Sequence, residues 1–128
     1  MASVVTNTGI KAFVDALVAD NTVKYIGIGS GTGGTATDTD LQATLAETRA
    51  TGTLSAVTTN TTDDTFQCQG TLSITDTDAI TECGVFDAAG TGATPTGGNM
   101  QIYADFSVIN LISGDSLTLT IKAVGDQA

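Results

Sequence analysis

Apolar side chains near the N-terminus recur at intervals of three and four residues, which places them on one face of a helix. These positions are Ile10, Phe13, Val14, Leu17 and Val18. A threonine or asparagine among residues 6–8 can accept a hydrogen bond from the first free backbone N–H groups. The pattern therefore predicts an N-terminal arm over residues 1–8 and one helix over about residues 8–19.

Beyond residue 22 the apolar positions alternate with polar ones, as in half-buried strands. The clearest alternation is in residues 66–74, whereas residues 23–29 have apolar side chains on both faces, as in a central strand. The expected strands are residues 23–29, 51–59, 66–74, 80–88, 102–108 and 117–123. The pattern predicts Cys68, Val108 and Leu119 on the apolar faces of their strands.

The connections are rich in Gly, Thr, Asn and Asp, which favour turns. Residues 30–39 and 89–99 are expected as exposed loops, the second pointing outward, and residues 40–47 as a short helical turn. The turn at residues 76–78 is expected to join residues 66–74 and 80–88 into a hairpin. The fold class predicted is mainly β: a single domain over residues 1–128, with a compact antiparallel β-sandwich or barrel of about six strands over residues 23–124 and one N-terminal α-helix.

Composition supports a thin, aliphatic core. Only 5% of the 128 residues are aromatic and Trp is absent, so Ala, Val, Ile and Leu supply most of the apolar volume. Abundant threonine suits a pleated, half-solvated surface better than a helix. A core of this kind often gains stability from neighbouring subunits.

The charge of the chain excludes several classes of partner. Fourteen acidic residues against four basic ones give a net charge of −10. Nucleic acids and anionic membranes bind clusters of basic side chains, which four scattered residues cannot form. The N-terminus lacks the charged and apolar regions of a signal peptide, and no apolar run approaches the ~18 residues of a membrane span. We expect a soluble protein made in the cytosol.

The segment GIGSGTGG, residues 27–34, follows a strand and resembles a phosphate-binding loop. A P-loop needs a lysine after its last glycine, and Thr35 and Ala36 stand there instead. A dinucleotide site would also need a βαβ unit, which the strand pattern does not offer. A flexible surface loop without a cofactor is the favoured interpretation.

The tetrapeptide TDTD occurs at residues 37–40 and 75–78, and spaced carboxylates can bind calcium. Neither copy has the other acidic positions of an EF-hand loop, so turns are favoured over a metal site. Asp63, Asp64 and Asp87 have the same interpretation, because aspartate hydrogen-bonds to its own backbone in turns.

The chain offers no catalytic set of residues. It has no histidine, and a Cys or Ser nucleophile would lack its usual base, so we expect no enzyme. In the expected hairpin Cys68 lies opposite Phe86 and Cys83 opposite Thr71, with the two thiols on opposite faces. A disulfide would then need a bulge or a register shift, and Cys68 is expected as a small buried core residue.

Four segments in this order resemble a family of short tailed-phage virion proteins, which includes capsid decoration proteins and head-proximal domains of tail fibres. They are TNTGIKAFVDAL with KYIGIGSGTG, ATDTDLQATLAETRATG, TLSITDTDAITECGVFDAAG and DFSVINLISGDSLTLTIK. Members of that family often have Val or Leu in place of Cys83 and a shorter loop at residues 89–99.

The resemblance implies a structural virion protein, most simply a capsid decoration (cement) protein on the outer surface of the major capsid protein lattice, commonly a homotrimer. It implies no catalytic residue, cofactor or metal. A tail-fibre or baseplate/collar adaptor is the alternative, and a ligand-binding module is a third interpretation that would need a deep pocket. The arm and the glycine-rich loop are the expected contact residues: Ala2, Ser3, Val4, Val5, Thr6, Ser30, Gly31, Thr32, Gly33 and Gly34.

Overall fold

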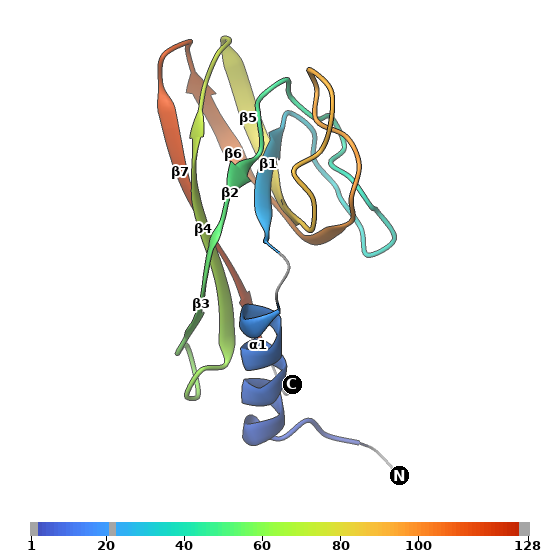
Figure 1. The fold of residues 1–128 in the computed structure, drawn as a ribbon, viewed down its shortest axis with the longest axis vertical. Helices are drawn as coiled ribbons and strands as arrows, with labels where there is room; N and C mark the ends of the chain where they lie inside the picture. The colour runs from blue at the N-terminus through green and yellow to red at the C-terminus, as the bar shows by residue number, and fades with distance from the viewer. Residues whose placement is uncertain (1–2, 21–22, 126–128) are drawn as a thin grey trace.

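A computed structural model describes residues 3–20 and 23–125, and these residues form one helix and seven strands (Figure 1). They are α1 (Asn7–Ala19), β1 (Tyr25–Gly29), β2 (Ala50–Thr51), β3 (Thr53–Val57), β4 (Thr65–Ser73), β5 (Asp78–Phe86), β6 (Met100–Leu111) and β7 (Ser116–Val124). Sheet A has the strand order β2-β1-β5-β6, and sheet B has the order β3-β4-β7, with every pair antiparallel. The predicted β-sandwich with one N-terminal helix is confirmed, as two separate sheets.

Helix α1 begins close to its predicted start. The Thr6 hydroxyl accepts a hydrogen bond from the backbone N–H of Gly9 at 3.1 Å, so the N-terminal cap is a threonine as expected. Ile10 and Val14 are buried. Phe13 is 68% exposed, although its spacing predicted the buried face. The apolar stripe of α1 is wider than the helix face that packs against sheet B. Phe13 lies at the edge of the stripe that sheet B does not cover.

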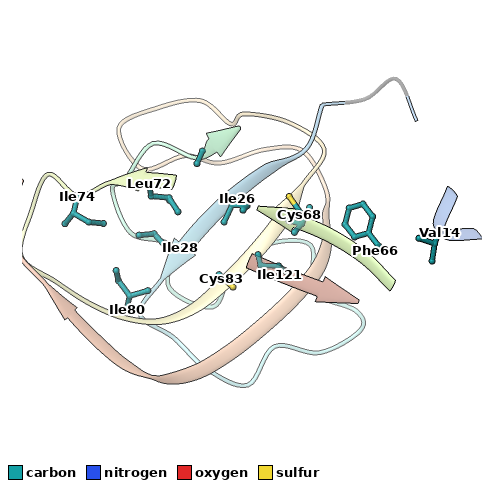
Figure 2. Close-up of a cluster of buried hydrophobic side chains, with 12 residues drawn as sticks. Val14, Ile26, Ile28, Phe66, Cys68, Leu72, Ile74, Ile80, Cys83 and Ile121 are labelled. Atoms are coloured by element: carbon teal, nitrogen blue, oxygen red, sulfur yellow. The ribbon is translucent and has the colours of Figure 1, made fainter. Parts of the chain in front are cut away.

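Sheet B is long, and two different elements cover its inner face. Sheet A covers one end, while α1 packs against β3 and β4 at the other end (Figure 1). Figure 2 shows Val14 of α1 beside Phe66 of β4, with Ile26 and Ile28 of β1 further along. The core is thin and aliphatic, with Phe66 as the one aromatic residue among the described residues of the main buried cluster.

The predicted hairpin of residues 66–74 and 80–88 is wrong. Strand β4 pairs with β3 and β7 in sheet B, whereas β5 pairs with β1 and β6 in sheet A. Residues 74–77 therefore carry the chain from one sheet to the other. The alternation in residues 66–74 gave the buried face of β4 correctly, but it does not specify the partner strand, and Cys83, expected on the face away from Cys68, lies in the core as well.

Both cysteines lie in the core, on facing sheets. Cys68 lies opposite Leu54 and Ile121, and Cys83 lies opposite Ile28 and Ala104, in place of the expected Phe86 and Thr71. Both are free thiols. Cys68 is fully buried, as predicted for a small core residue.

A turn at residues 113–114 also crosses between the sheets, from β6 to β7. Gly114 has a φ of 96°, which favours glycine. The Asp115 carboxylate accepts a hydrogen bond from the backbone N–H of Ile112 at 2.9 Å.

Residues 40–47 do not form the predicted helical turn. Their backbone is irregular, with one bridge between Thr44 and Gly29, and Leu41 is buried. The buried carboxylate of Glu82 accepts hydrogen bonds from the N–H groups of Gln42 and Ala43, which holds the segment against sheet A.

The alternation also placed Val108 wrongly. A register shift between β5 and β6 turns its side chain outward, where it is 52% exposed.

Candidate interaction surface

The N-terminal arm, where half of the expected contact residues lie, is exposed. Residues 3–6 all face solvent, with Val4 72% and Val5 43% exposed, while Ala2 lies outside the described residues. Val5 and Phe13 line a shallow hollow of about 160 Å³ together with Ile10, Val14 and Gly125. We call this set, with Val4, the N-terminal patch. None of its side chains is ionisable, in a chain of net charge −10.

The glycine-rich loop, where the other expected contact residues lie, is held against sheet A. The N–H of Gly31 donates to Glu82 at 3.2 Å, the N–H of Gly33 donates to Asp105 at 3.0 Å, and Thr81 donates to the carbonyl of Gly31 at 2.7 Å. The free, flexible loop that the sequence predicted is therefore corrected to a tethered one. Since carboxylates already bind the two N–H groups, these groups do not form a phosphate cradle.

The arm and the loop are far apart in the fold. The arm lies beyond α1 at the lower end of the long axis in Figure 1, whereas the loop lies beside β1 in the upper half. Ser30, Thr32 and Gly33 remain exposed, and Gly31 and Gly34 are half-buried. The structure therefore does not bring the two groups of expected contact residues together into one site.

Glu82 holds the loop, and the sequence analysis missed it. This fully buried residue accepts hydrogen bonds from the N–H groups of Gly31, Gln42 and Ala43, the last at 2.8 Å, and from the Tyr103 hydroxyl at 2.9 Å. Buried charged groups need several such partners to be tolerated. The sequence did contain a signal: Glu82 is an isolated charge between the apolar positions of a strand.

Arg49 holds the base of the other predicted loop, residues 89–99. Its side chain is 1% exposed; one terminal nitrogen donates to the carbonyls of Ala88 and Gly97, both at 2.9 Å, and the guanidinium lies 3.6 Å from the centre of the Phe86 ring. Burial lowers the pKa of Arg49, against the charges of Asp40 and Asp87. The loop at residues 89–99 is mostly exposed, as predicted, but Arg49 fastens its base.

Glycines make room for these two charged side chains on the outer face of sheet A. A Cβ atom on Gly29 would collide with the Glu82 carboxylate and come within 2.7 Å of the Ala43 carbonyl. A Cβ atom on Gly27 would lie 3.1 Å from the Phe86 ring and 3.4 Å from Arg49. The glycines in KYIGIG therefore serve close packing under the loops.

The TDTD segment at residues 37–40 forms a turn, as predicted, in which Asp38 accepts a hydrogen bond from the N–H of Thr35 at 2.7 Å. The predicted turn in the copy at residues 75–78 is wrong, because this copy is the crossing between the sheets and Asp78 already belongs to β5. Asp87 accepts a hydrogen bond from the N–H of Asn99 at 2.7 Å, across the base of the loop rather than within a turn of its own. Among residues 3–20 and 23–125, no group of three or more His, Cys, Asp and Glu side chains is placed to hold a metal ion.

The thiols are poor nucleophiles. Burial, with a smaller contribution from the Glu82 charge, raises the pKa of Cys83 to about 11, and burial raises the pKa of Cys68. Both stay protonated near neutral pH, where the thiolate is the reactive form. A hollow of about 300 Å³ lies on the surface beside Tyr103 and Asp38, with no cysteine in its lining.

The outer face of sheet B is the second surface without acidic side chains. The strands β3, β4 and β7 contain no acidic residue, and Lys122 is their one charged side chain. Thr71 and Thr118 hydrogen-bond across this face at 2.8 Å, and Gln69 donates to Thr120 at 3.1 Å. The acidic residues are thus confined to sheet A, the loops and the helix.

Comparison of the sequence with known proteins gives no relative: no protein-family model matches the chain, and no curated protein matches it. In the described part of the chain, no helix is long and apolar enough to cross a membrane.

Proposed function

We propose that this chain is a structural protein of a tailed virus, a capsid decoration protein that binds the outer surface of the major capsid protein lattice and stabilises the head as a homotrimer. The observation that carries the proposal is the N-terminal patch. It exposes Val4, Val5 and Phe13 at one end of the molecule, and nothing in the described chain covers them. Exposed apolar clusters commonly mark contact surfaces.

The distribution of charge supports the same role. A protein of net charge −10 that packs at high copy number must limit repulsion at its contacts. The N-terminal patch and the outer face of sheet B are free of acidic side chains. Contacts through these two surfaces would bring copies and shell together without apposing carboxylates.

The two groups of expected contact residues fit contacts with two different neighbours. The arm lies at the lower end of the molecule in Figure 1, and the loop that follows β1 lies in the upper half, where Ser30 and Thr32 are exposed. In the proposed assembly the arm contacts the shell and the loop contacts a neighbouring subunit. Because Glu82 and Asp105 tether the loop, its binding would cost little conformational entropy.

The test is binding of the purified full chain to undecorated capsids. Phe13→Ser should weaken binding by about thirtyfold, the effect of losing an aromatic anchor worth about 2 kcal/mol. Ile112→Ser is the matched control, since Ile112 is 61% exposed in the turn between β6 and β7, and it should bind as the original chain does. Equal binding of both variants would contradict the proposal.

The copy number in purified particles separates the proposal from its alternative. A decoration protein is present in hundreds of copies on the head, whereas a tail-fibre or baseplate/collar adaptor is present in a few copies at the tail. Absence from the particle would exclude both roles.

A further inference from the structure

A buried carboxyl group, that of Glu47, and a half-buried one, that of Asp78, meet where the chain crosses from sheet B to sheet A. Glu47 precedes β2 and is 2% exposed, and Asp78 is the first residue of β5. Residues 74–77 connect β4 to β5 beside them. This is a different place from the Glu82 and Arg49 contacts, which lie under the loops of sheet A.

Glu47 is surrounded by hydrogen-bond donors from this crossing. Its oxygens accept from the N–H of Thr75 at 3.1 Å, from the Thr75 hydroxyl at 3.0 Å and from the N–H of Asp76 at 3.3 Å. Such donors favour the ionised form of a carboxyl group. Glu47 thereby ties the segment before β2 to the start of the crossing.

Asp78 has no comparable donors. Its carboxyl group contacts that of Glu47, and its Oδ2 atom is shielded from solvent without a donor among the described residues. Two ionised carboxylates both accept hydrogen bonds and repel each other. Their contact becomes a hydrogen bond only when one of them carries a proton.

We propose that Glu47 and Asp78 share one proton, which resides mainly on Asp78, and that this proton makes the crossing from sheet B to sheet A a pH-sensitive latch. With the proton bound, Asp78 donates to Glu47 and the crossing is closed. Without it, two negative charges face each other in a site shielded from water, and the crossing loosens.

Arg49 follows Glu47 by two residues and lines the same hollow, but its guanidinium donates to the carbonyls of Ala88 and Gly97 and does not contribute to the pKa shift of either carboxyl group. Asp76, in the crossing itself, is the further charged group that acts on Asp78. Leu111 lies opposite Asp78 on β6, and β4 ends in Ser73 and Ile74, none of which is charged. Burial raises the pKa of Asp78, and the contact with Glu47 and the charge of Asp76 raise it further.

Glu47 responds in the opposite direction. Burial raises the pKa of Glu47, but the hydrogen bonds from Thr75, Asp78 and Asp76 outweigh burial and lower it. The two groups therefore titrate as one system, with a wide pH range in which it holds a single proton.

The sign of the stability effect follows from these directions. A raised pKa of Asp78 means that the folded chain binds a proton that the unfolded chain has released above about pH 4. The contribution of this proton is full below the unfolded pKa and is lost as the pH rises through the folded pKa. Below the lowered pKa of Glu47, the pair loses its charge and the tie to Thr75 weakens.

The latch also borders a hollow of about 230 Å³ between residues 46–50 and the end of β4. Glu47 and Thr75 both line it, together with Arg49 and Leu72. Opening of the latch would therefore separate β2 from β4 at this hollow and give water a route to the core near Leu72.

The experiment measures denaturant unfolding of the full chain from about pH 4 to about pH 9. In the original chain the unfolding equilibrium constant should rise by up to about tenfold per pH unit up to the folded pKa of Asp78, since one proton is released. Asp78→Asn should remove this rise, because its amide donates to Glu47 without titrating. Asp76→Asn is the matched control. The unfolding equilibrium constant of this variant should still rise with pH, but the rise should end at a lower pH, because the charge of Asp76 no longer raises the pKa of Asp78.

A direct measurement on the original chain completes the test. Site-resolved carbon NMR of the carboxyl groups should show Asp78 protonated at a pH where ordinary aspartates are ionised, and Glu47 ionised. An ordinary titration of Asp78, or an unchanged pH slope in a folded Asp78→Asn variant, would overturn the proposal. If that variant does not fold, the NMR titration alone decides.

Discussion

At the scale of single residues, buried carboxylates hold irregular backbone in this protein. Glu82 accepts hydrogen bonds from three loop N–H groups. Glu47 accepts from N–H groups of the crossing that follows β4, and Asp64 accepts from N–H groups of the turn that precedes β4. Loops cannot satisfy their N–H groups by pairing with strands, so a side chain must do so. Aspartate in turns was predictable from the sequence, but the long-range partners of Glu82 and Glu47 were not, because they are 21 to 51 residues away.

Asp64 gives an acid-dependent prediction at this scale. Hydrogen bonds from the N–H groups of Thr61, Thr59 and Asn60 and from the Thr65 hydroxyl hold the pKa of Asp64 well below its usual range, against burial, which raises it. A lowered pKa contributes stability above the unfolded pKa, about 3.9, and that stability is lost as the pH falls through the folded value.

We expect Asp64→Asn to destabilise the chain near neutral pH and to flatten the loss of stability below about pH 4, measured by urea unfolding at a series of pH values. An amide oxygen lacks the charge that binds these N–H groups. Asp63→Asn, which changes the neighbouring carboxylate paired with Lys11, should keep the acid slope. A steep acid slope retained in Asp64→Asn would contradict this account.

At the scale of elements, the sequence specified the existence of strands better than their partners. Residues 66–74 and 117–123 alternate as strands should, and β4 and β7 follow them closely. The short connection at residues 74–77 suggested a hairpin, but it changes sheets, as does the connection at residues 112–115. A sandwich can close through tight crossings as well as through hairpins, and the local pattern is the same in both cases.

Helix α1 depends on its cap, because neither end carries a charge that favours the helix dipole. Thr6→Ala removes the hydrogen bond to Gly9 and should lower the free energy of unfolding by about 1 kcal/mol. Thr8→Ala makes the same change two residues on, at an exposed helical position, and should raise stability by up to about 0.5 kcal/mol. Opposite signs in chemical denaturation would confirm the cap; equal effects would reject it.

At the scale of the whole molecule, charge opposes folding. Fourteen acidic residues face four basic ones, and Lys11, Lys24 and Arg49 already lie within 4 Å of aspartates. The remaining carboxylates repel one another across a small domain, and this repulsion is screened by salt.

We therefore expect added NaCl to stabilise the chain. Each 1 kcal/mol of relieved repulsion should raise Tm by about 4 °C for a domain of this size. Differential scanning calorimetry at increasing NaCl measures this. Sucrose stabilises proteins by exclusion from their surface without screening charge, so it should have little effect at the ~0.1 M concentrations at which NaCl already raises Tm. A Tm that falls with salt would mean that ion pairs, rather than repulsion, dominate the electrostatics.

The pairing of β4 with both β3 and β7 has a consequence for how the chain reaches this fold. Strand β4 is made early, but its second partner, β7, begins at Ser116, some fifty residues later. During synthesis on the ribosome, one edge of β4 must wait unpaired until the last strand emerges. Such distant pairings also slow folding, so the emergence of β7, rather than local structure, sets the moment at which sheet B can be completed.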